Sequence, residues 1–358
     1  MKRKMLVLGA GASIGSKRYP ILSSLDQMRD TMPSADNFFY DLFRTNRTEN
    51  RPAGHLNFLG LTFEGLNDLI IRLWNINEDG YNPDEWRGVN IEEVMTFFDI
   101  GSKMFEPTTN EGKMYRTAQK SLLSFMHPFI PMICEDQHCE YLLDVLYQLN
   151  KNDCIISFNW DTIIDFSLQR ANMPQLKNYA KLLRADHINP SNFRNVGLLL
   201  KLHGSFNWMI CNNPKCSTYN KIKPPFQNNR YKLQPLRKTY TCPDCGNGNM
   251  KVLIVPPVSD KMIYKNSFLK NQWLIAREKL LDISEIIFIG YSFPPTDYYS
   301  DWLFRQIYFI EKRPELIITI VNPEYGKKGS IVTKRYNNLF KGFTIKSYKT
   351  LKDYAKNN

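Results

Sequence analysis

Several short apolar runs in this chain are each followed at once by a glycine-rich or polar segment. These segments lie far apart in the sequence, at residues 9–13, 158–161, 202–205 and 290–293. Short continuous apolar runs are typical of strands buried on both faces, as in a parallel sheet. Loops at the carboxyl ends of parallel strands open into one crevice where ligands bind. The pattern therefore predicts that the four segments form one site.

The apolar runs also predict the fold. Strands are expected at residues 5–8, 154–157, 197–202, 251–255, 285–289, 316–321 and 343–347. Residues 19–150 differ, because apolar side chains recur there at helical spacing, as at Ile91, Val94, Met95 and Phe98. We therefore predict an α/β protein with a Rossmann-like parallel sheet formed by residues 1–18 and 151–358. A helical insertion is expected over residues 19–150, and a small zinc-binding module over residues 208–250.

The composition restricts the class of protein. The chain has 358 residues, 43% of them hydrophobic, which allows a large core and excludes a disordered chain. No apolar run approaches the ~20 residues that span a bilayer, and glycines interrupt the basic start, so we expect a cytoplasmic protein without a membrane segment. The net charge of +12 suits a ligand with phosphates. Because the basic residues are spread along the chain, direct nucleic-acid binding stays open.

Gly9, Gly11 and Ser13 directly follow the first expected strand. Glycines let the backbone come close to a pyrophosphate, and the exposed N–H groups bind its oxygens, so this segment indicates a phosphate cradle. A plain tight turn after a strand is the alternative. The chain has no Gly-Lys-Ser or Gly-Lys-Thr, which argues against a P-loop ATPase.

Asn159, Asp161 and His203 follow two of the expected strands. Two residues apart on an extended backbone, Asn159 and Asp161 would point the same way and hold a sugar hydroxyl, a carboxamide or a water. The alternative is an Asx turn that closes the strand. His203 at the mouth of a strand is placed to act as a general base, or else to cap the strand by a hydrogen bond to backbone.

The seven cysteines, an odd number, do not suit a disulfide framework. Cys211 and Cys216 form one close pair, and Cys242 and Cys245 form a second pair, with 25 residues between the two pairs. Two such pairs are typical of a tetrahedral four-thiolate zinc site. Because four protein ligands leave no open position, the zinc ion would be structural.

The order of these motifs resembles the sirtuin superfamily. The matching elements are the glycine loop, the Asn-x-Asp segment, the strand ending in His-Gly, the four-cysteine module, the Gly290-Tyr291-Ser292 segment and a late strand ending in Val321-Asn322. By this resemblance, the residues that contact NAD would be Gly9, Ala10, Gly11, Ala12, Ser13, Gly290, Ser292 and Asn322. Asn159, Asp161 and His203 would flank the nicotinamide ribose.

Two departures separate the chain from the protein-deacylating sirtuins. Those carry a Gly-Ile-Pro-Asp-Phe-Arg-like segment after the glycine loop, whereas residues 14–20 here read Ile-Gly-Ser-Lys-Arg-Tyr-Pro. The middle motif reads Phe-Asn-Trp-Asp at residues 158–161, in place of Gln-Asn-Ile-Asp. Residues 290–297 and the helical insertion resemble instead the sirtuin-like proteins of bacterial antiphage defence, which are NAD hydrolases that deplete NAD in an infected cell.

The resemblance thus implies cleavage of the nicotinamide–ribose bond of NAD+ with water as the acceptor. Asn159 would position the water, Asp161 would orient the nicotinamide amide, and His203 would act as general base or hold the ribose hydroxyls. An NAD-dependent protein deacylase and a non-catalytic module that senses NAD or ADP-ribose are the alternatives. A toxic NAD hydrolase must be held inactive, so we expect a homo-oligomer or a partner protein, such as a nucleic-acid-handling ATPase, to control it.

Overall fold

The structure, a computed structural model, describes most of the chain. The described residues are 3–14, 17–18, 35–40, 57–58, 61–62, 64–76, 83–134, 137–185, 187–219, 221–223, 226–227, 232–233, 241–246, 250–255, 263, 266–310 and 315–357. Most of the segment in which the chain departs from the deacylating sirtuins, at residues 15–16 and 19–20, lies outside this set. In the part that is described, no helix combines the length and the apolar character needed to cross a membrane.

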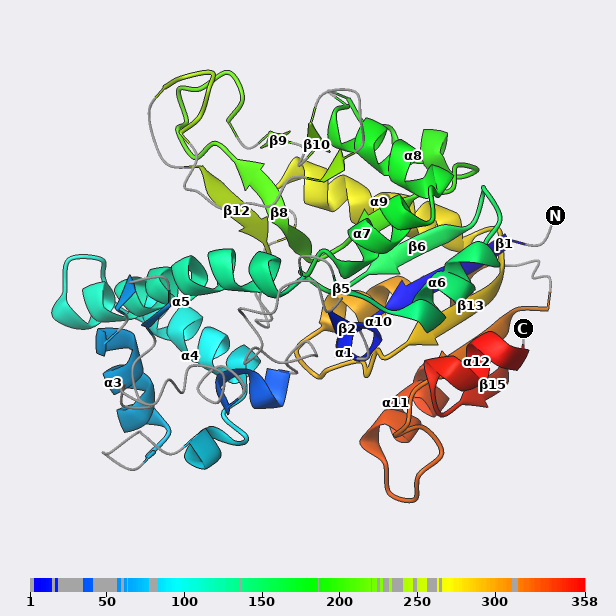
Figure 1. Cartoon of the computed structure of the whole chain (residues 1–358), viewed down its shortest axis with the longest axis horizontal. Coiled ribbons are helices and arrows are strands. Elements are labelled where there is room, and N and C mark those ends of the chain that lie inside the picture. The colour runs from blue at the N-terminus through cyan, green and yellow to red at the C-terminus, as the bar shows by residue number, and fades with distance from the viewer. Residues whose placement is uncertain are drawn as a thin grey trace.

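A six-stranded sheet forms the centre of the fold (Figure 1). Its strands are β1 (Arg3–Leu8), β6 (Cys154–Ser157), β7 (Leu199–Lys201), β13 (Ile283–Ile289), β14 (Ile317–Val321) and β15 (Thr344–Tyr348). All neighbouring pairs are parallel, in the order β15-β14-β13-β1-β6-β7. Four of the strands, β1, β6, β13 and β14, are nearly continuous apolar runs and are buried along most of their length, which confirms the predicted parallel α/β sheet.

The strand order sets where a ligand site belongs. The chain runs outward from β1 through β6 to β7, then returns to β13 on the other side of β1 and continues to β14 and β15. In chain order this is the sequence 3-2-1-4-5-6 found in Rossmann folds. The order of the strands therefore changes direction between β1 and β13, although the strands themselves remain parallel. In such sheets ligands bind outside the carboxyl ends of the strands at this switch point.

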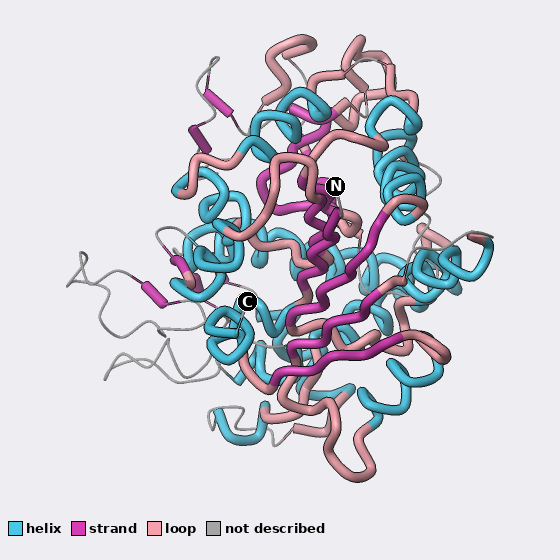
Figure 2. The backbone as a smooth tube through the Cα atoms, turned by 90° about the vertical axis from the view of Figure 1, so that its right-hand side faces the viewer, coloured by secondary structure: helices cyan, strands magenta, loops and turns pink. Residues whose placement is uncertain are grey.

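Helices lie on both sides of the sheet (Figure 2). They are α6 (Glu140–Tyr147), α7 (Ile163–Arg170), α8 (Pro174–Leu183), α9 (Ser267–Leu280), α10 (Tyr298–Arg305), α11 (Ile331–Leu339) and α12 (Leu351–Asn357), with short 3-10 turns η4 (Pro190–Phe193) and η6 (Gln306–Phe309). Helix α6 packs against α7 and α12, and α9 packs against α10. The buried residues of the sheet and of these helices form one continuous hydrophobic core.

The described residues between 35 and 134 build a second, mainly helical layer with its own core. Its helices are α3 (Glu64–Leu73), α4 (Ile91–Met104) and α5 (Asn110–Cys134), with 3-10 turns η2 (Ala35–Asn37) and η3 (Pro83–Trp86). Val94 and Phe98 on α4 are fully buried, as their spacing predicts. This second core also contains Ile163 and Phe206 from the sheet region, so the two layers are in contact. Helix α6, within the predicted insertion, belongs instead to the core of the sheet.

One predicted strand of the parallel sheet lies elsewhere. Residues 251–254 form β12 (Lys251–Ile254), which pairs antiparallel with β8 (Gly204–Ile210) in a separate sheet that also contains β9 (Ile222–Lys223). The expectation of a parallel strand was wrong: β12 pairs antiparallel with β8, and only one of its four residues is buried.

The remaining elements are short. Helix α1 (Ala10–Ile14) follows β1 directly. Two-stranded pairs are formed by β2 (Lys17–Arg18) with β5 (Gln137–His138), β3 (Asn57–Phe58) with β4 (Leu61–Thr62), and β10 (Phe226–Gln227) with β11 (Lys232–Leu233).

Candidate functional site

The glycine loop, residues 9–13, and the segment after β13, residues 290–297 (the 290-loop), meet at the switch point of the sheet. The N–H of Gly9 donates to the carbonyl of Ile289, and the N–H of Gly11 donates to the carbonyl of Gly290, both at 3.0 Å. Gly290 itself has a φ of +61°, which side-chain-bearing residues rarely adopt. Two segments that are nearly 280 residues apart in sequence therefore form one double loop beside β1 and β13.

The structure gives these glycines a packing role. A Cβ atom on Gly9 would lie 2.5 Å from the Cα of Tyr291, and one on Gly290 would lie 2.4 Å from the backbone N of Ala12. Such contacts are far below van der Waals distance, so larger residues would push the loops apart. The glycines are thus required for the two loops to touch each other.

Ser13, Asn159 and Asp161 form a cluster next to the glycine loop. The Asn159 amide Nδ2 donates to the carbonyl of Gly9 at 2.8 Å and to the Ser13 hydroxyl at 2.9 Å. The Ser13 hydroxyl in turn donates to Asp161 Oδ2 at 2.7 Å. Asn159 and Asp161 thus both contact the same hydroxyl, as their alternation along an extended backbone predicts.

The two oxygens of Asp161 have different partners. Oδ2 faces Ser13, while Oδ1 accepts the backbone N–H of Ile163 at 3.0 Å, which is the Asx turn considered as the alternative. Burial raises the pKa of Asp161, although Lys201, the Ser13 hydroxyl and the Ile163 N–H act in the opposite direction. The carboxyl group is therefore a buried acceptor whose charged form is disfavoured by its surroundings.

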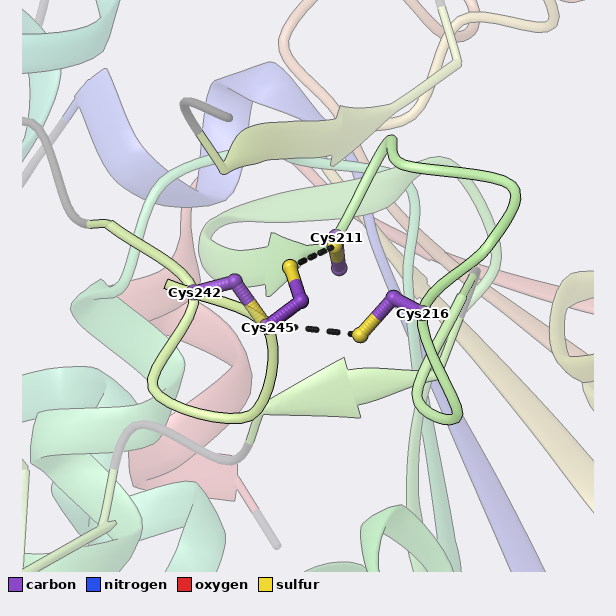
Figure 3. Close-up of side chains that lie close together, drawn as sticks. All are labelled: Cys211, Cys216, Cys242 and Cys245. Atoms are coloured by element: carbon purple, nitrogen blue, oxygen red, sulfur yellow. Dashed lines mark hydrogen bonds between the residues drawn. The ribbon is translucent and has the colours of Figure 1, made fainter. Parts of the chain in front are cut away.

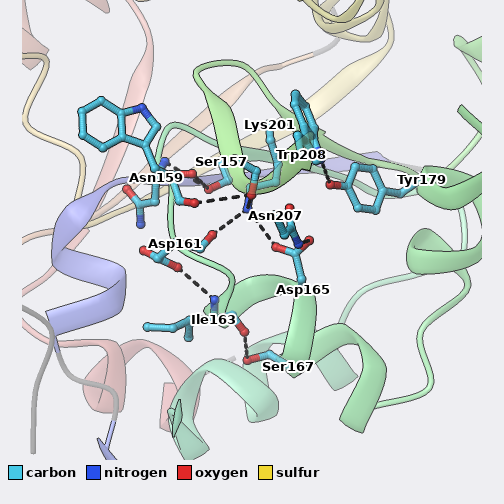
Figure 4. A network of polar contacts seen from close by, with 12 residues as sticks. Ser157, Asn159, Asp161, Ile163, Asp165, Ser167, Tyr179, Lys201, Asn207 and Trp208 are labelled. Atoms are coloured by element: carbon cyan, nitrogen blue, oxygen red, sulfur yellow. Dashed lines mark hydrogen bonds and ion pairs between the residues drawn. The ribbon is translucent and has the colours of Figure 1, made fainter. Parts of the chain in front are cut away.

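A buried lysine that was not among the predicted site residues donates a hydrogen bond to this cluster. Lys201, the last residue of β7, donates from Nζ to the carbonyl of Asp161 at 2.6 Å and to Asp165 Oδ2 at 2.9 Å (Figure 4). It also donates to the Ser205 hydroxyl. Lys201 and Asp165 are fully buried. The sequence signal was a lysine inside an apolar run, because a charge there needs a buried partner.

His203 lies at the end of β7 but contacts a different set of residues. Its Nε2 is 3.3 Å from Asp297 Oδ2, and its ring packs edge-on against Phe158, with centroids 5.0 Å apart. Asp297 also accepts the Tyr291 hydroxyl at 2.5 Å. Neither Asp297 nor Phe158 was among the predicted site residues. The signal was present in the run Gly-Tyr-Ser-Phe-Pro-Pro-Thr-Asp, where an Asp precedes a helix as its N-cap.

The predicted adenosine-side residues lie at the same edge of the sheet. Asn322 follows β14 and is buried, its Oδ1 accepting the N–H of Glu324 at 2.9 Å in a local turn. Ser292 follows β13, and its carbonyl accepts a hydrogen bond from Arg335. Both residues follow parallel strands of the same sheet at its carboxyl edge, as the glycine loop and Asn159 do. The hydrogen bonds described above join Ser13, Asn159 and Asp161 to one another.

Two cavities lie beside α10 in the described part of the chain. The larger, about 420 Å³, is lined by Ile263, Lys270, Trp273, Leu274, Tyr298, Tyr299 and Trp302. Trp273 also packs against His203, with ring centroids 6.2 Å apart. The smaller, about 260 Å³, lies between α10 and α11 and has Asp297, Arg305 and Arg335 among its lining residues. Asp297 thus contacts His203 and lines the smaller cavity.

Cys211, Cys216, Cys242 and Cys245 come together as predicted (Figure 3). The sulfur atoms lie within 4.8 Å of one another, and the pairs Cys211–Cys245 and Cys216–Cys242 are 3.8 Å apart. A zinc ion with thiolates at about 2.3 Å in a tetrahedron separates the sulfurs by about 3.8 Å, so the donor set fits zinc. All four ligand positions would be filled, as in a structural site.

The strand order, the parallel register and the polar residues at the carboxyl edge define an α/β protein with a Rossmann-like sheet and a four-cysteine module that can hold a metal ion. Searches with protein-family models and against curated protein sequences find no match to this chain.

Proposed function

We propose that this protein is a sirtuin-type NAD+ hydrolase that cleaves the nicotinamide–ribose bond and transfers the ADP-ribosyl group to water. The proposal is supported by the position of the polar clusters. NAD would lie at the switch point between β1 and β13, with its phosphates at Gly9, Ala10, Gly11, Ala12 and Ser13. Gly290, Ser292 and Asn322 would border its adenosine end.

One observation carries the choice of water as the acceptor. Asn159 is half-buried, and its amide nitrogen is fixed by the Gly9 carbonyl and the Ser13 hydroxyl. Among the described residues, no hydrogen bond ends on its Oδ1. An amide held from one side and unengaged on the other is suited to accept a hydrogen bond from a water and hold it in place.

The other residues have separate roles in this scheme. Nicotinamide departs through an oxocarbenium-like state, so a positioned acceptor and a fixed polar surrounding lower the barrier. Asp161 orients the nicotinamide amide, and His203 takes the proton of the attacking water or holds the ribose hydroxyls. The zinc ion supplies no step; its four cysteines hold the module over residues 208–250 together.

A non-catalytic NAD-sensing or ADP-ribose-sensing module is the second candidate, and one feature favours it. The Asx turn at Asp161 and the bonds of Ser13 satisfy these groups within the protein. A site with its polar atoms already paired is suited to binding without turnover.

The decisive experiment incubates the purified protein with NAD, with and without an acylated peptide. NAD loss and free nicotinamide without peptide are expected, and the variants Asn159→Ala and His203→Ala should lower the rate by about 10²-fold or more. Asn192→Ala and His187→Ala are matched controls, because both residues are exposed. Turnover that strictly requires the acylated peptide would favour a protein deacylase. Tight NAD binding with no turnover would favour the sensing module.

We also propose that the protein is a cytoplasmic defence effector, whose activity must be inhibited until it is needed. Self-assembly, or a partner such as a nucleic-acid-handling ATPase, would provide this inhibition. The support is an exposed aromatic surface on α10 and η6, where Tyr298, Trp302, Tyr308 and Phe309 are between 43% and 76% exposed. Light scattering on the purified protein tests self-assembly; a stable, fully active monomer would contradict it.

A further inference from the structure

His203 is held by a buried carboxylate, and the fold provides this contact from a distant part of the chain. The imidazole Nε2 lies 3.3 Å from Asp297 Oδ2, with the His203 side chain 9% and the Asp297 side chain 1% exposed. The backbone of His203 is fixed as well, because its carbonyl accepts the N–H of Val255 at 2.8 Å. Ring and backbone are therefore both anchored.

Asp297 is itself fixed by several donors. The Tyr291 hydroxyl donates to Oδ2 at 2.5 Å, and the N–H of Ser300 donates to Oδ1, so Asp297 is the N-cap of α10. Burial and the neighbouring Asp297 carboxylate raise the pKa of Tyr291 well above its usual value, so its hydroxyl stays protonated and donates. Donors at both oxygens stabilise the carboxylate form.

Two aromatic rings pack against the imidazole. Phe158 from the end of β6 packs edge-on, and Trp273 from α9 packs at 6.2 Å between ring centroids. In the described part of the chain, Asp297 contacts the imidazole, and the titratable hydroxyl of Tyr291 contacts Asp297 from behind. Between apolar rings, a carboxylate acts on an imidazole with little screening by water.

We propose that Asp297 is a positioning residue for His203: its carboxylate accepts a hydrogen bond from the Nε2–H group, fixes the ring at the mouth of β7 and favours the imidazolium form. The neutral ring then carries its proton on Nε2, and the proton gained on titration goes to Nδ1. The role in catalysis rests on the proposed NAD hydrolysis, while the control of His203 by Asp297 does not.

The test is an NMR titration of the ¹⁵N-histidine-labelled full-length protein, which has five histidines. A His203→Gln sample assigns the His203 signals. In Asp297→Asn, the midpoint of the His203 titration should fall by about 1 pH unit or more, because an opposite charge in contact shifts titration by about 1–3 units. Asparagine also caps helices well, so α10 is preserved. Asp301→Asn is the matched control, since it removes the same charge from the exposed side of α10.

A second variant acts in the opposite direction. Tyr291→Phe keeps the ring that stacks on Phe158 but removes the hydroxyl that donates to Asp297. With one donor fewer, the carboxylate accepts from His203 more strongly, so the midpoint should rise. A purely structural role for Asp297 would not produce opposite shifts in the two variants.

A His203 midpoint that Asp297→Asn leaves unchanged, or that Asp301→Asn lowers equally, would overturn the proposal. If the wild type cleaves NAD, Asp297→Asn should also lose about tenfold or more in rate, with its pH profile shifted in the same direction as the titration. If the wild type does not cleave NAD, the proposed function fails, and the titration still decides the role of Asp297.

Discussion

The six-stranded sheet and the four-cysteine module are held together in different ways. The sheet has a large core of buried apolar side chains contributed by strands and by helices on both sides. Among the described residues, the core of the module consists of Met209, Cys211, Cys216, Cys242 and Met250. A core of this size buries too little apolar surface to offset the entropy of ordering the chain. We therefore expect the hydrophobic effect to stabilise the sheet and a metal ion bound by the four cysteines to stabilise the module.

The largest expected effect is that of metal removal. We expect one zinc ion per chain, bound by the four cysteines. Chelation or Cys242→Ser should remove hydrogen-exchange protection from residues 209–219 and 241–246, because structural zinc contributes about 10–16 kcal/mol of binding free energy to small modules. Protection of β1, β6 and β13 should persist.

Cys154→Ala is the matched control, since Cys154 is buried in β6 and lies outside the cysteine cluster. It should leave the zinc content at the wild-type level. A folded, protected module in metal-free protein would break the comparison between the two regions.

Next in size is the loss of the buried lysine in the sheet. Lys201→Met leaves Asp165 buried without its ion-pair partner, so the free energy of unfolding should fall by about 3–5 kcal/mol. The zinc content should not change. The control is Lys327→Met, whose pair with Glu324 is exposed and should contribute only about 0–1 kcal/mol. Equal effects of the two substitutions in chemical denaturation would show that the Lys201 network does not stabilise the sheet.

A smaller effect is expected at the contact between the loops. Gly290→Ala adds a Cβ atom 2.4 Å from the backbone of Ala12, at a φ of +61°. Gly326→Ala has a similar φ of +85° but open space around its Cβ. The Gly326 variant should lose about 1–2 kcal/mol from backbone strain alone. The Gly290 variant should lose about 1–3 kcal/mol more, because the loops must move apart. Equal losses would indicate that the loops do not pack tightly.

The smallest effect is a dependence on pH. Because the pKa of Asp161 is raised in the folded protein, the folded chain binds the proton more tightly than the unfolded chain. The contribution of Asp161 to stability is therefore present at low pH and falls as the pH rises through the raised pKa, by about 1.4 kcal/mol per unit of difference.

Asp161→Asn does not titrate, so its stability relative to the wild type should improve as the pH rises from about 4 to about 8. Thermal unfolding across this range measures the difference. Asp301→Asn, at an exposed carboxylate, should show no comparable trend. A relative stability of Asp161→Asn that falls with pH would contradict the raised pKa.

The sequence alone determined much of this protein. Continuous apolar runs predicted the parallel strands, because such runs are stable only when buried on both faces. The spacing of Cys211, Cys216, Cys242 and Cys245 predicted the cluster, since short knuckles leave few other arrangements. The alternation of Asn159 and Asp161 predicted that both side chains point the same way, and both contact Ser13.

Only the tertiary structure decided the rest. Asp297 reaches His203, and Lys201 reaches the carbonyl of Asp161, through contacts that no local pattern encodes. Residues 251–254 pair antiparallel with β8, a partner that their apolar pattern could not reveal. The glycines of the first loop pack against a second loop that follows β13, far away in the sequence. Local sequence fixes periodicity and conformation, whereas partners distant in sequence are chosen by how the whole chain packs.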